Sequence, residues 1–391
     1  MAEYDSSKIG YTLRINGEYN NTLDIKGFSW MLKDPSYCYK FFWLEALVWL
    51  ISEGVEETTF GTVIDEMIAN AWYPVREFHI HLSGIQGGEV RDGLERAVEC
   101  LSKISGLSAS ASKTEIKNAI HEHDKELKVH KEQLTNMVPY RALAGFFKEN
   151  PGSAWNSVAR MVEYIERINR LEKPLPYTLG TSGGLKRELR FDPEWMKMIQ
   201  DNMVPILGWI QYEKVKWLQT NNPEVPGLVY KLAPLDEKMR KLGHVRKLWE
   251  GVLEIRPVPD VFTGRPLQTK AYDVDHFVPW SFVMNDELWN LMPMDSSLNA
   301  SKSSHLPKWD PYFVRFAENQ FMLYEMIQSN SHIRKLYEGC YRDNLHSIWA
   351  QRELYRPGNT REEFVSILQK NMKPIYDSAW RQGYEIWWFS M

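Results

Sequence analysis

Apolar side chains recur at helical spacing along most of the chain. The clearest run covers residues 39–51, where Phe, Trp, Leu and Val surround a single carboxylate, Glu45. This spacing predicts a buried helix, and the run is too short to cross a bilayer, which needs about 20 apolar residues. The same periodicity predicts further helices at residues 63–72, 92–106, 113–133, 192–220, 311–329 and 331–349.

Two features interrupt the helical pattern in the first quarter of the chain. Pro74 is expected to stop the helix that begins near residue 63, because proline lacks an N–H group and clashes with the preceding turn. Residues 78–82 alternate apolar and polar side chains and predict a short strand. On that strand His79 and His81 share one face. With no acidic residue close by in the sequence, a structural role is favoured over a shared metal ion.

Glycine- and proline-rich stretches divide the chain. Residues 173–184 and 221–227 have the composition of loops and domain boundaries. The predicted parts are a helical N-terminal domain with a regulatory or partner-binding role (1–172), a helical connector (173–227), a module of different character (228–310) and a C-terminal helical segment (311–391).

Composition narrows the class of protein. The 391 residues carry a net charge of −4 and include 16 tryptophans, which indicates a globular chain with large side chains to bury. Cys38, Cys100 and Cys340 lie far apart, so neither a disulfide framework nor a zinc ribbon is expected. The N-terminus lacks the basic and then apolar pattern of a signal peptide. Together these features predict a cytoplasmic protein.

A basic segment opens the module at residues 228–310. Between residues 231 and 247, two acidic residues stand against six basic ones: Lys231, Lys238, Arg240, Lys241, Arg246 and Lys247. Such a cluster is a candidate for gripping the phosphates of a duplex without reading its bases. A solvated basic helix face is the alternative interpretation.

Residues 273–307 hold the candidate chemistry. A β-branched and aromatic run carries the pair Asp275-His276, and a polar turn with Asn290 leads to Asn299 at the start of a predicted short helix. Hard divalent cations take oxygen ligands, so Asp275 and Asn299 suit Mg²⁺ or Mn²⁺. Because strand side chains alternate, His276 points to the opposite face from Asp275. It is therefore a candidate general base that takes a proton from water.

This pattern resembles the HNH endonuclease motif, and it is similar to the HNH domain of RNA-guided type II CRISPR nucleases. The matching positions are Asp275, His276, Val278, Pro279, Ser281, Asn290, Asn299 (in place of the histidine of many members) and the pair Lys302-Ser303. The resemblance implies a ββα-metal fold, a β-hairpin packed on a helix around one metal ion. It also implies that His276 is the general base, that Asp275 and Asn299 hold the cation, and that Asn290 pins the hairpin loop.

One departure from the family concerns zinc. Many HNH domains carry two Cys-x-x-Cys pairs that bind a structural zinc ion, whereas residues 258–267 contain no cysteine. A Thr263-Gly264 turn is able to close the hairpin without metal. No structural zinc is therefore expected, and the hairpin has to rely on the rest of the chain for support.

Three residues near the motif have more than one interpretation. Asp273 is interpreted as a residue that contacts a metal ligand without binding the metal itself. The alternative is an ordinary residue at the edge of the strand. Lys302 is a candidate phosphate contact, and an exposed helix lysine in solvent explains it equally well. His305 follows soon after Asn299, but Asn299 fits the spacing of the motif better, so His305 is assigned to the surface.

The sequence thus predicts a mainly α protein with a helical N-terminal region, a ββα-metal nuclease module and C-terminal helices. The predicted function is metal-dependent hydrolysis of DNA, and the hypothesis for its role is an effector of bacterial antiphage defence whose helical N-terminal part senses a signal or binds a partner. DNA and a regulatory protein or second copy of the chain are the predicted partners, and no membrane is expected. An RNA-targeting or mobile-element nuclease and a catalytically silent nucleic-acid-binding module remain alternatives.

Overall fold

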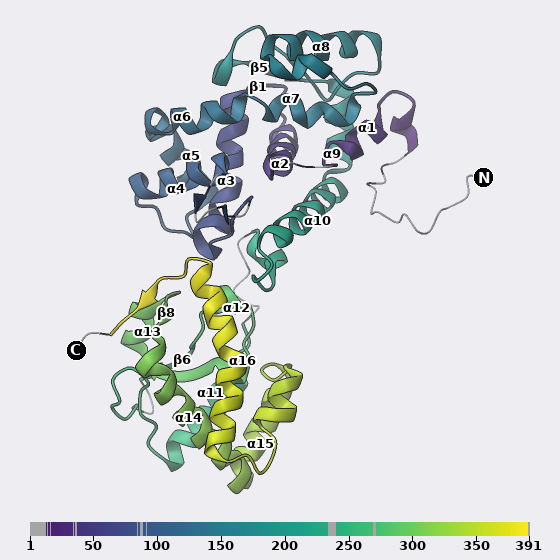
Figure 1. The fold of residues 1–391 in the computed structure, drawn as a ribbon. Helices are drawn as coiled ribbons and strands as arrows, with labels where there is room; N and C mark the ends of the chain where they lie inside the picture. Colours follow the sequence, from purple (N-terminus) through teal and green to yellow (C-terminus); the bar gives the residue numbers. More distant parts are fainter. Residues whose placement is uncertain are drawn as a thin grey trace. The chain divides into compact units, whose positions relative to one another are not determined.

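The computed structural model shows a largely helical chain that divides into two compact units, Met1–Pro223 and Glu224–Met391 (Figure 1). It describes residues 13, 15, 17–33, 35, 37–83, 85–86, 89–90, 92–233, 240–268 and 271–389. The predicted mainly helical class is confirmed. The division between the units falls inside the Gly/Pro-rich stretch at residues 221–227, whereas the stretch at 173–184 belongs to the first unit.

Helices make up most of the first unit, and several start at capping residues that the sequence supplies. Asp92 accepts hydrogen bonds from two backbone N–H groups at the start of α4, and Ser112 and Glu115 form a reciprocal capping box at α5. The helices are α1 (Ile25–Trp30), α2 (Tyr39–Ser52), α3 (Phe60–Phe78), α4 (Gly93–Ser105), α5 (Lys113–Glu122), α6 (Asp124–Thr135), α7 (Val138–Ala142), α8 (Val158–Leu171), α9 (Pro193–Asp201) and α10 (Met203–Asn221).

Short strands complete the first unit. β1 (Glu57–Thr59), β5 (Glu188–Phe191) and β4 (Tyr177–Leu179) pair antiparallel in the order β1-β5-β4, and β2 (Ile85–Gln86) pairs with β3 (Glu89–Val90). The β1-β5-β4 sheet joins the start of α3 to residues 177–191, so the predicted connector packs onto the N-terminal helices.

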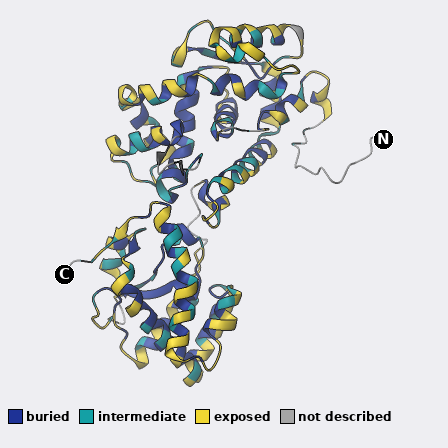
Figure 2. Ribbon diagram, viewed as in Figure 1, coloured by how far each residue is buried: buried dark blue, intermediate teal, exposed yellow. Residues whose placement is uncertain are grey.

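Helix α2 forms the core of the first unit. As predicted, it is buried on nearly all sides, and Figure 2 shows it among other buried segments. The side chain of its one carboxylate residue, Glu45, is 7% exposed and pairs with Lys214 of α10, whose side chain is 2% exposed and whose Nζ lies 2.9 Å from Oε2. A charge in such a place requires a partner, because an unpaired ion in the interior is very costly. Within the described part of the chain, no helix has the length and apolar character needed to cross a membrane.

The structure differs from the predictions around residues 74–82. Pro74 lies inside α3, which continues to Phe78, because burial of Val75 and Phe78 offsets the loss of one backbone hydrogen bond. No strand forms at residues 78–82, since His79 ends the helix in the left-handed region with φ of 52°. His81 does have an acidic partner, because Glu95 of α4 lies 2.7 Å from its Nδ1.

Three predicted helices are broken or shorter than expected. The one at residues 113–133 breaks at His123 into α5 and α6, the one at 192–220 breaks at Asn202 into α9 and α10, and the one at 331–349 ends at Gly339. Breaks of this kind depend on tertiary packing, which overrides helical periodicity in the sequence.

The second unit contains a β-hairpin among helices. β6 (Tyr272–His276) pairs antiparallel with β7 (Leu291–Asp295), with Asp275 opposite Met292, and α13 (Ser296–Lys302) follows directly. β8 (Leu306–Pro307) pairs parallel with β9 (Ile386–Trp387). The other helices are α11 (Gly243–Ile255), α12 (Trp280–Val283), α14 (Trp309–Ser329), α15 (Ser331–Gly339) and α16 (Arg361–Arg381).

Aromatic packing fixes the end of strand β6. Phe277, the residue after the strand, is fully buried and lies against Trp309, Phe313 and Phe316 of α14. A buried aromatic ring contributes both a large apolar area and favourable ring contacts. The chain that leaves β6 is therefore anchored in the core of the second unit.

The buried Glu45–Lys214 pair gives a testable prediction. Lys214→Met leaves the Glu45 carboxylate uncompensated in the interior, so the first unit should lose roughly 3–5 kcal/mol of unfolding free energy. Hydrogen exchange of the α2 and α10 amides measures that loss. Lys216→Met is the matched control, because its ammonium is half exposed and should matter by less than about 0.5 kcal/mol. Equal protection in the two variants would contradict the prediction.

Candidate active site

Strand β6 separates the predicted chemical groups onto two faces. Its burial alternates, with Asp273 and Asp275 partly exposed and Tyr272, Val274 and His276 buried. The predicted alternation of Asp275 and His276 is thus confirmed. Carboxylates lie on the open face, and the imidazole points into the unit.

Lys302 of α13 forms an ion pair with Asp275 on the open face. Its Nζ lies 2.8 Å from Oδ2, the lysine side chain is fully buried and the carboxylate is 15% exposed. The alternative of an exposed, solvated Lys302 is wrong, because the last turn of α13 faces β6. Burial alone would raise the pKa of Asp275, but the Lys302 ammonium and the neighbouring His276 outweigh it, so the pKa lies below its usual value.

Asn299 and Asp273 make a second contact between α13 and β6. The Asn299 Nδ2 donates to Asp273 Oδ2 at 3.3 Å, and Arg246 of α11 lies 3.9 Å from Asp273 Oδ1. The structure therefore brings Asn299 to the face that carries both β6 carboxylates, and its hydrogen bond goes to Asp273. This contact orients the carboxamide.

His276 has polar neighbours on one ring nitrogen only. Its Nε2 lies 3.1 Å from the backbone oxygen of Asn285 and 3.1 Å from Asp286 Oδ1. Its Nδ1 is buried and has no hydrogen-bond partner among the described residues, and the side chain is 0% exposed. Since two acceptors face Nε2, that nitrogen carries the proton, and Nδ1 keeps the lone pair.

Asn290 ties the end of the hairpin to the loop after β6. Its Oδ1 accepts from Val278 N and its Nδ2 donates to Val278 O, both at 2.8 Å, and the side chain is fully buried. The carboxamide thus pairs with a peptide group as a strand would. The loop beyond His276 is held at this point.

The basic segment is spread over several environments. Lys231 is fully buried, donates to Phe282 O at 2.6 Å, and burial lowers its pKa to about 7. Lys241 pairs with Asp343 and Arg246 lies beside Asp273, whereas Lys247 is exposed. Lys238 lies outside the described residues.

Arg240 and His305 flank the candidate site. The Arg240 guanidinium lies over the Trp280 ring, and its Nε is 3.9 Å from Asp286. His305 is partly exposed, and its Nδ1 lies 2.8 Å from the backbone oxygen of Lys302. Among the described residues of the basic segment, only Arg246 lies within 4 Å of a β6 carboxylate, that of Asp273.

The donor types on the open face fit a hard divalent cation. Asp275, Asp273 and Asn299 offer carboxylate and carboxamide oxygens, which Mg²⁺ and Mn²⁺ prefer. The depressed pKa of Asp275 keeps it ionised, as a ligand must be. Within the described ranges, no group of three or more His, Cys, Asp or Glu side chains is arranged to hold a metal.

Two residues of the site have roles that the sequence did not reveal. Asp260 Oδ1 accepts from the backbone of Phe262 and Thr263, and its Oδ2 accepts from Asp295 N, so it closes the turn at Gly264 and joins it to β7. Asp286 faces His276. In the sequence, the pair Asn285-Asp286 indicates a turn. It does not reveal the contact with His276, because no local pattern tells which side chain of a turn faces inward.

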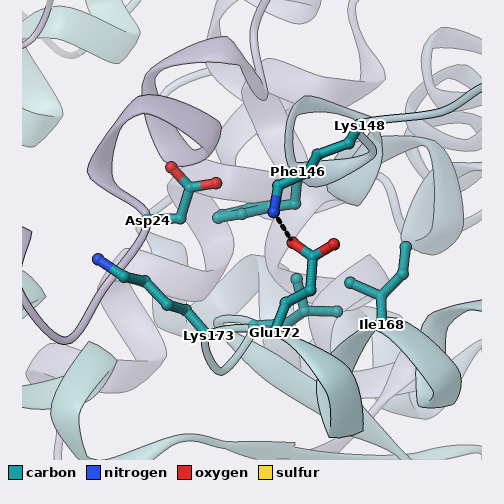
Figure 3. A pocket seen from close by; sticks show the side chains of 7 residues that line it. Asp24, Phe146, Lys148, Ile168, Glu172 and Lys173 are labelled. Carbon is teal, nitrogen blue, oxygen red and sulfur yellow. Dashed lines mark ion pairs between the residues drawn. The ribbon is translucent and has the colours of Figure 1, made fainter.

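The first unit contains a separate cavity of about 420 Å³ (Figure 3). Its charged side chains already have partners: Lys148 pairs with Glu172 at 2.6 Å, and Lys173 donates to the backbone oxygens of Asn20 and Leu23. Asp24 accepts from the first turn of α1. The charged side chains that line this cavity therefore give no indication of a bound ligand.

The Asn290 contact predicts a selective loss of stability. Asn290→Asp replaces the N–H donor by an oxygen that faces the Val278 carbonyl in the interior, so the second unit should lose roughly 3 kcal/mol of unfolding free energy. Urea unfolding with hydrogen exchange measures it. Asn330→Asp is the control, because Asn330 caps α15 through its Oδ1 and Asp caps equally well. Similar losses in both variants would rule out this account of Asn290.

Comparison with known proteins identifies a family to which this region of the chain is similar. Residues 260–308 match the family model described as HNH endonuclease, which covers the turn at Gly264, the β6–β7 hairpin and α13. The chain has no significant match among curated proteins or among solved structures. An HNH domain indicates a nuclease, a hydrolase of phosphodiester bonds acting on nucleic acid. The second unit therefore carries an HNH endonuclease domain at residues 260–308.

Proposed function

We propose that the second unit hydrolyses DNA phosphodiester bonds in a reaction that depends on one divalent cation, Mg²⁺ or Mn²⁺. The observation that carries the proposal is the contact of α13 with β6. It brings Asn299 to Asp273 and Lys302 to Asp275 across 26 and 27 residues of sequence, so oxygen donors gather on the open face of β6, while His276 lies on its other face. The HNH family match supports phosphodiester chemistry at this place.

Each residue on the open face has a distinct proposed task. Asp275 and Asn299 would hold the cation, and Asp273 orients Asn299 through its hydrogen bond. The bound cation supplies positive charge that stabilises the phosphate and the leaving oxygen. Lys302 balances the negative charge of Asp275 and is the proposed phosphate contact on this face.

His276 is the proposed general base. It accepts the proton of the attacking water on Nδ1, while its Nε2 proton stays directed at Asn285 O. Asn290 fixes the loop that follows, so the ring keeps its orientation. Because His276 has no exposed surface, the proposal requires water to enter on the Nδ1 side when substrate binds.

The first test is plasmid cleavage by the full chain with Mg²⁺, Mn²⁺ or EDTA. Wild type should nick or linearise DNA with either cation, and His276→Ala should lower the rate by roughly 10²–10⁴-fold, the usual contribution of a general base. His305→Ala is the matched control, because it removes a nearby, partly exposed histidine and should change the rate less than about twofold.

Other outcomes separate the alternatives. Cleavage that survives EDTA, or full activity of His276→Ala, would sink the proposed mechanism. Cleavage of RNA but not DNA would favour the RNA-targeting nuclease. Tight DNA binding without cleavage by any variant would favour a binding module.

The basic segment is proposed to bind the phosphate backbone through Lys238, Arg240, Lys241, Arg246 and Lys247. Lys247 is the clearest case, since it is exposed on α11 and makes no ion pair within the part of the chain that the structure describes. Lys247→Ala should weaken DNA binding and make the plot of log affinity against log salt shallower by about 0.9. Lys335→Ala, also exposed but on α15, is the control. Unchanged salt dependence in Lys247→Ala would remove it from the interface.

The proposal extends to an effector of bacterial antiphage defence, with the first unit receiving a signal or binding a partner. This part rests on the long helical region that precedes the HNH domain, which we expect to regulate the nuclease. Phage plating on cells that express the full chain or His276→Ala tests it. Protection by wild type alone supports the defence role, and equal plating on both strains contradicts it.

A further inference from the structure

The turn after α12 brings a carboxylate to the proposed general base. Met284 ends α12 in the left-handed region with φ of 56°, and the chain reverses there. Asn285 and Asp286 follow, and each places an oxygen 3.1 Å from His276 Nε2. Asp286 Oδ1 is buried and has no hydrogen bond among the described residues.

Asp286 is itself fixed by segments on both sides of the HNH domain. Its Oδ2 accepts from Lys241 N at 2.9 Å. The Asn344 carboxamide donates to the backbone oxygens of Lys241 and Asp286, and Leu288 N donates to Asn344 O at 2.7 Å. The Lys241 N–H group therefore holds the carboxylate itself, and the Asn344 contacts hold the backbone that carries it.

We propose that Asp286 is a positioning residue for His276 in the cleavage reaction, an inference that rests on the proposed function above. The Nε2 proton is directed at Asn285 O, and the negative Oδ1, 3.1 Å from the same nitrogen, favours the tautomer in which Nε2 is protonated and Nδ1 is free to accept the proton of water. Once that proton has moved to Nδ1, the imidazolium lies beside the negative Oδ1. Asp286 takes no proton itself, as in the Asp–His arrangement of other hydrolases.

The electrostatic setting of Asp286 supports this role. Burial alone would raise its pKa, but the approach of His276 and the Lys241 N–H group outweigh it, so the pKa lies below its usual value. A second reading is that Asp286 only holds the turn to Lys241. The two readings differ in whether the effect of Asp286 passes through His276.

A kinetic comparison separates them. Asp286→Asn keeps the volume and an acceptor but removes the charge, and it should lower kcat by roughly 10–10²-fold with KM and Mn²⁺ affinity within twofold. In the His276→Ala background the same substitution should have no further effect, because it acts through the ring. Asp343→Asn is the control, since Asp343 also pairs with Lys241 but the structure records no contact between it and His276.

Some results would overturn the inference. A loss of the same size in the His276→Ala background, or a fall in the folded fraction large enough to explain the loss of kcat, would show a purely structural role. A rise in KM with kcat unchanged would also contradict it.

A second measurement tests the contact between Asp286 and His276 without requiring cleavage activity. The ¹⁵N NMR signals of the His276 ring report which nitrogen carries the proton, and Asp286→Ala should shift them while Asp343→Asn leaves them in place. If wild type cuts no substrate, the proposed function fails, and these signals still decide whether Asp286 orients the imidazole. Unchanged ring signals in Asp286→Ala would overturn that contact.

Discussion

The alternation of side chains in the five-residue strand β6 is the constraint on which the rest of the site depends. Because Asp273 and Asp275 share the open face, that face must collect positive and amide groups, and Lys302, Arg246 and Asn299 meet this need. The imidazole of His276 enters the interior, where an unsatisfied polar group costs about 1–3 kcal/mol, so a carbonyl and a carboxylate face it there. A slip of one residue against β7 would exchange the two faces. The pairing of Asp275 with Met292 therefore determines which face carries the carboxylates and which carries the imidazole.

The HNH domain depends on chain that lies outside residues 260–308. Its turn carries no cysteine, and Asp260 instead organises it by hydrogen bonds. The turn that faces His276 is bound by Lys241 on one side of the domain and by Asn344 on the other, and the Glu287 carboxylate accepts from two more backbone N–H groups beyond it. These hydrogen bonds connect the domain to segments on both sides of it. The supporting residues could not be recognised from the motif, because their task is set by three-dimensional contact.

Sequence reasoning predicted the features that depend on local periodicity and on motif spacing. The helical class, the buried helix at residues 39–51 and the alternation of Asp275 and His276 follow from patterns within a few residues. The hairpin was implied by the resemblance of residues 273–307 to the HNH motif. Predictions that needed long-range contact were less successful. Pro74 stays within α3 because of what Val75 and Phe78 bury, and Lys302 is interior because α13 packs on β6. Asp286 was not found at all, since a turn gives no periodic signal for the direction of its side chains.

The buried Lys302–Asp275 pair also affects how substitutions at the proposed metal site should be interpreted. Replacing Asp275 by alanine would remove a candidate ligand and would also leave the Lys302 ammonium uncompensated in the interior, at a cost of several kcal/mol. Loss of cleavage in such a variant would therefore mix unfolding with loss of the cation. Asn299 differs, because its recorded side-chain contact is a single hydrogen bond to a partly exposed carboxylate. A change at Asn299 separates the chemistry of the proposed cation from the stability of the fold more cleanly than a change at Asp275.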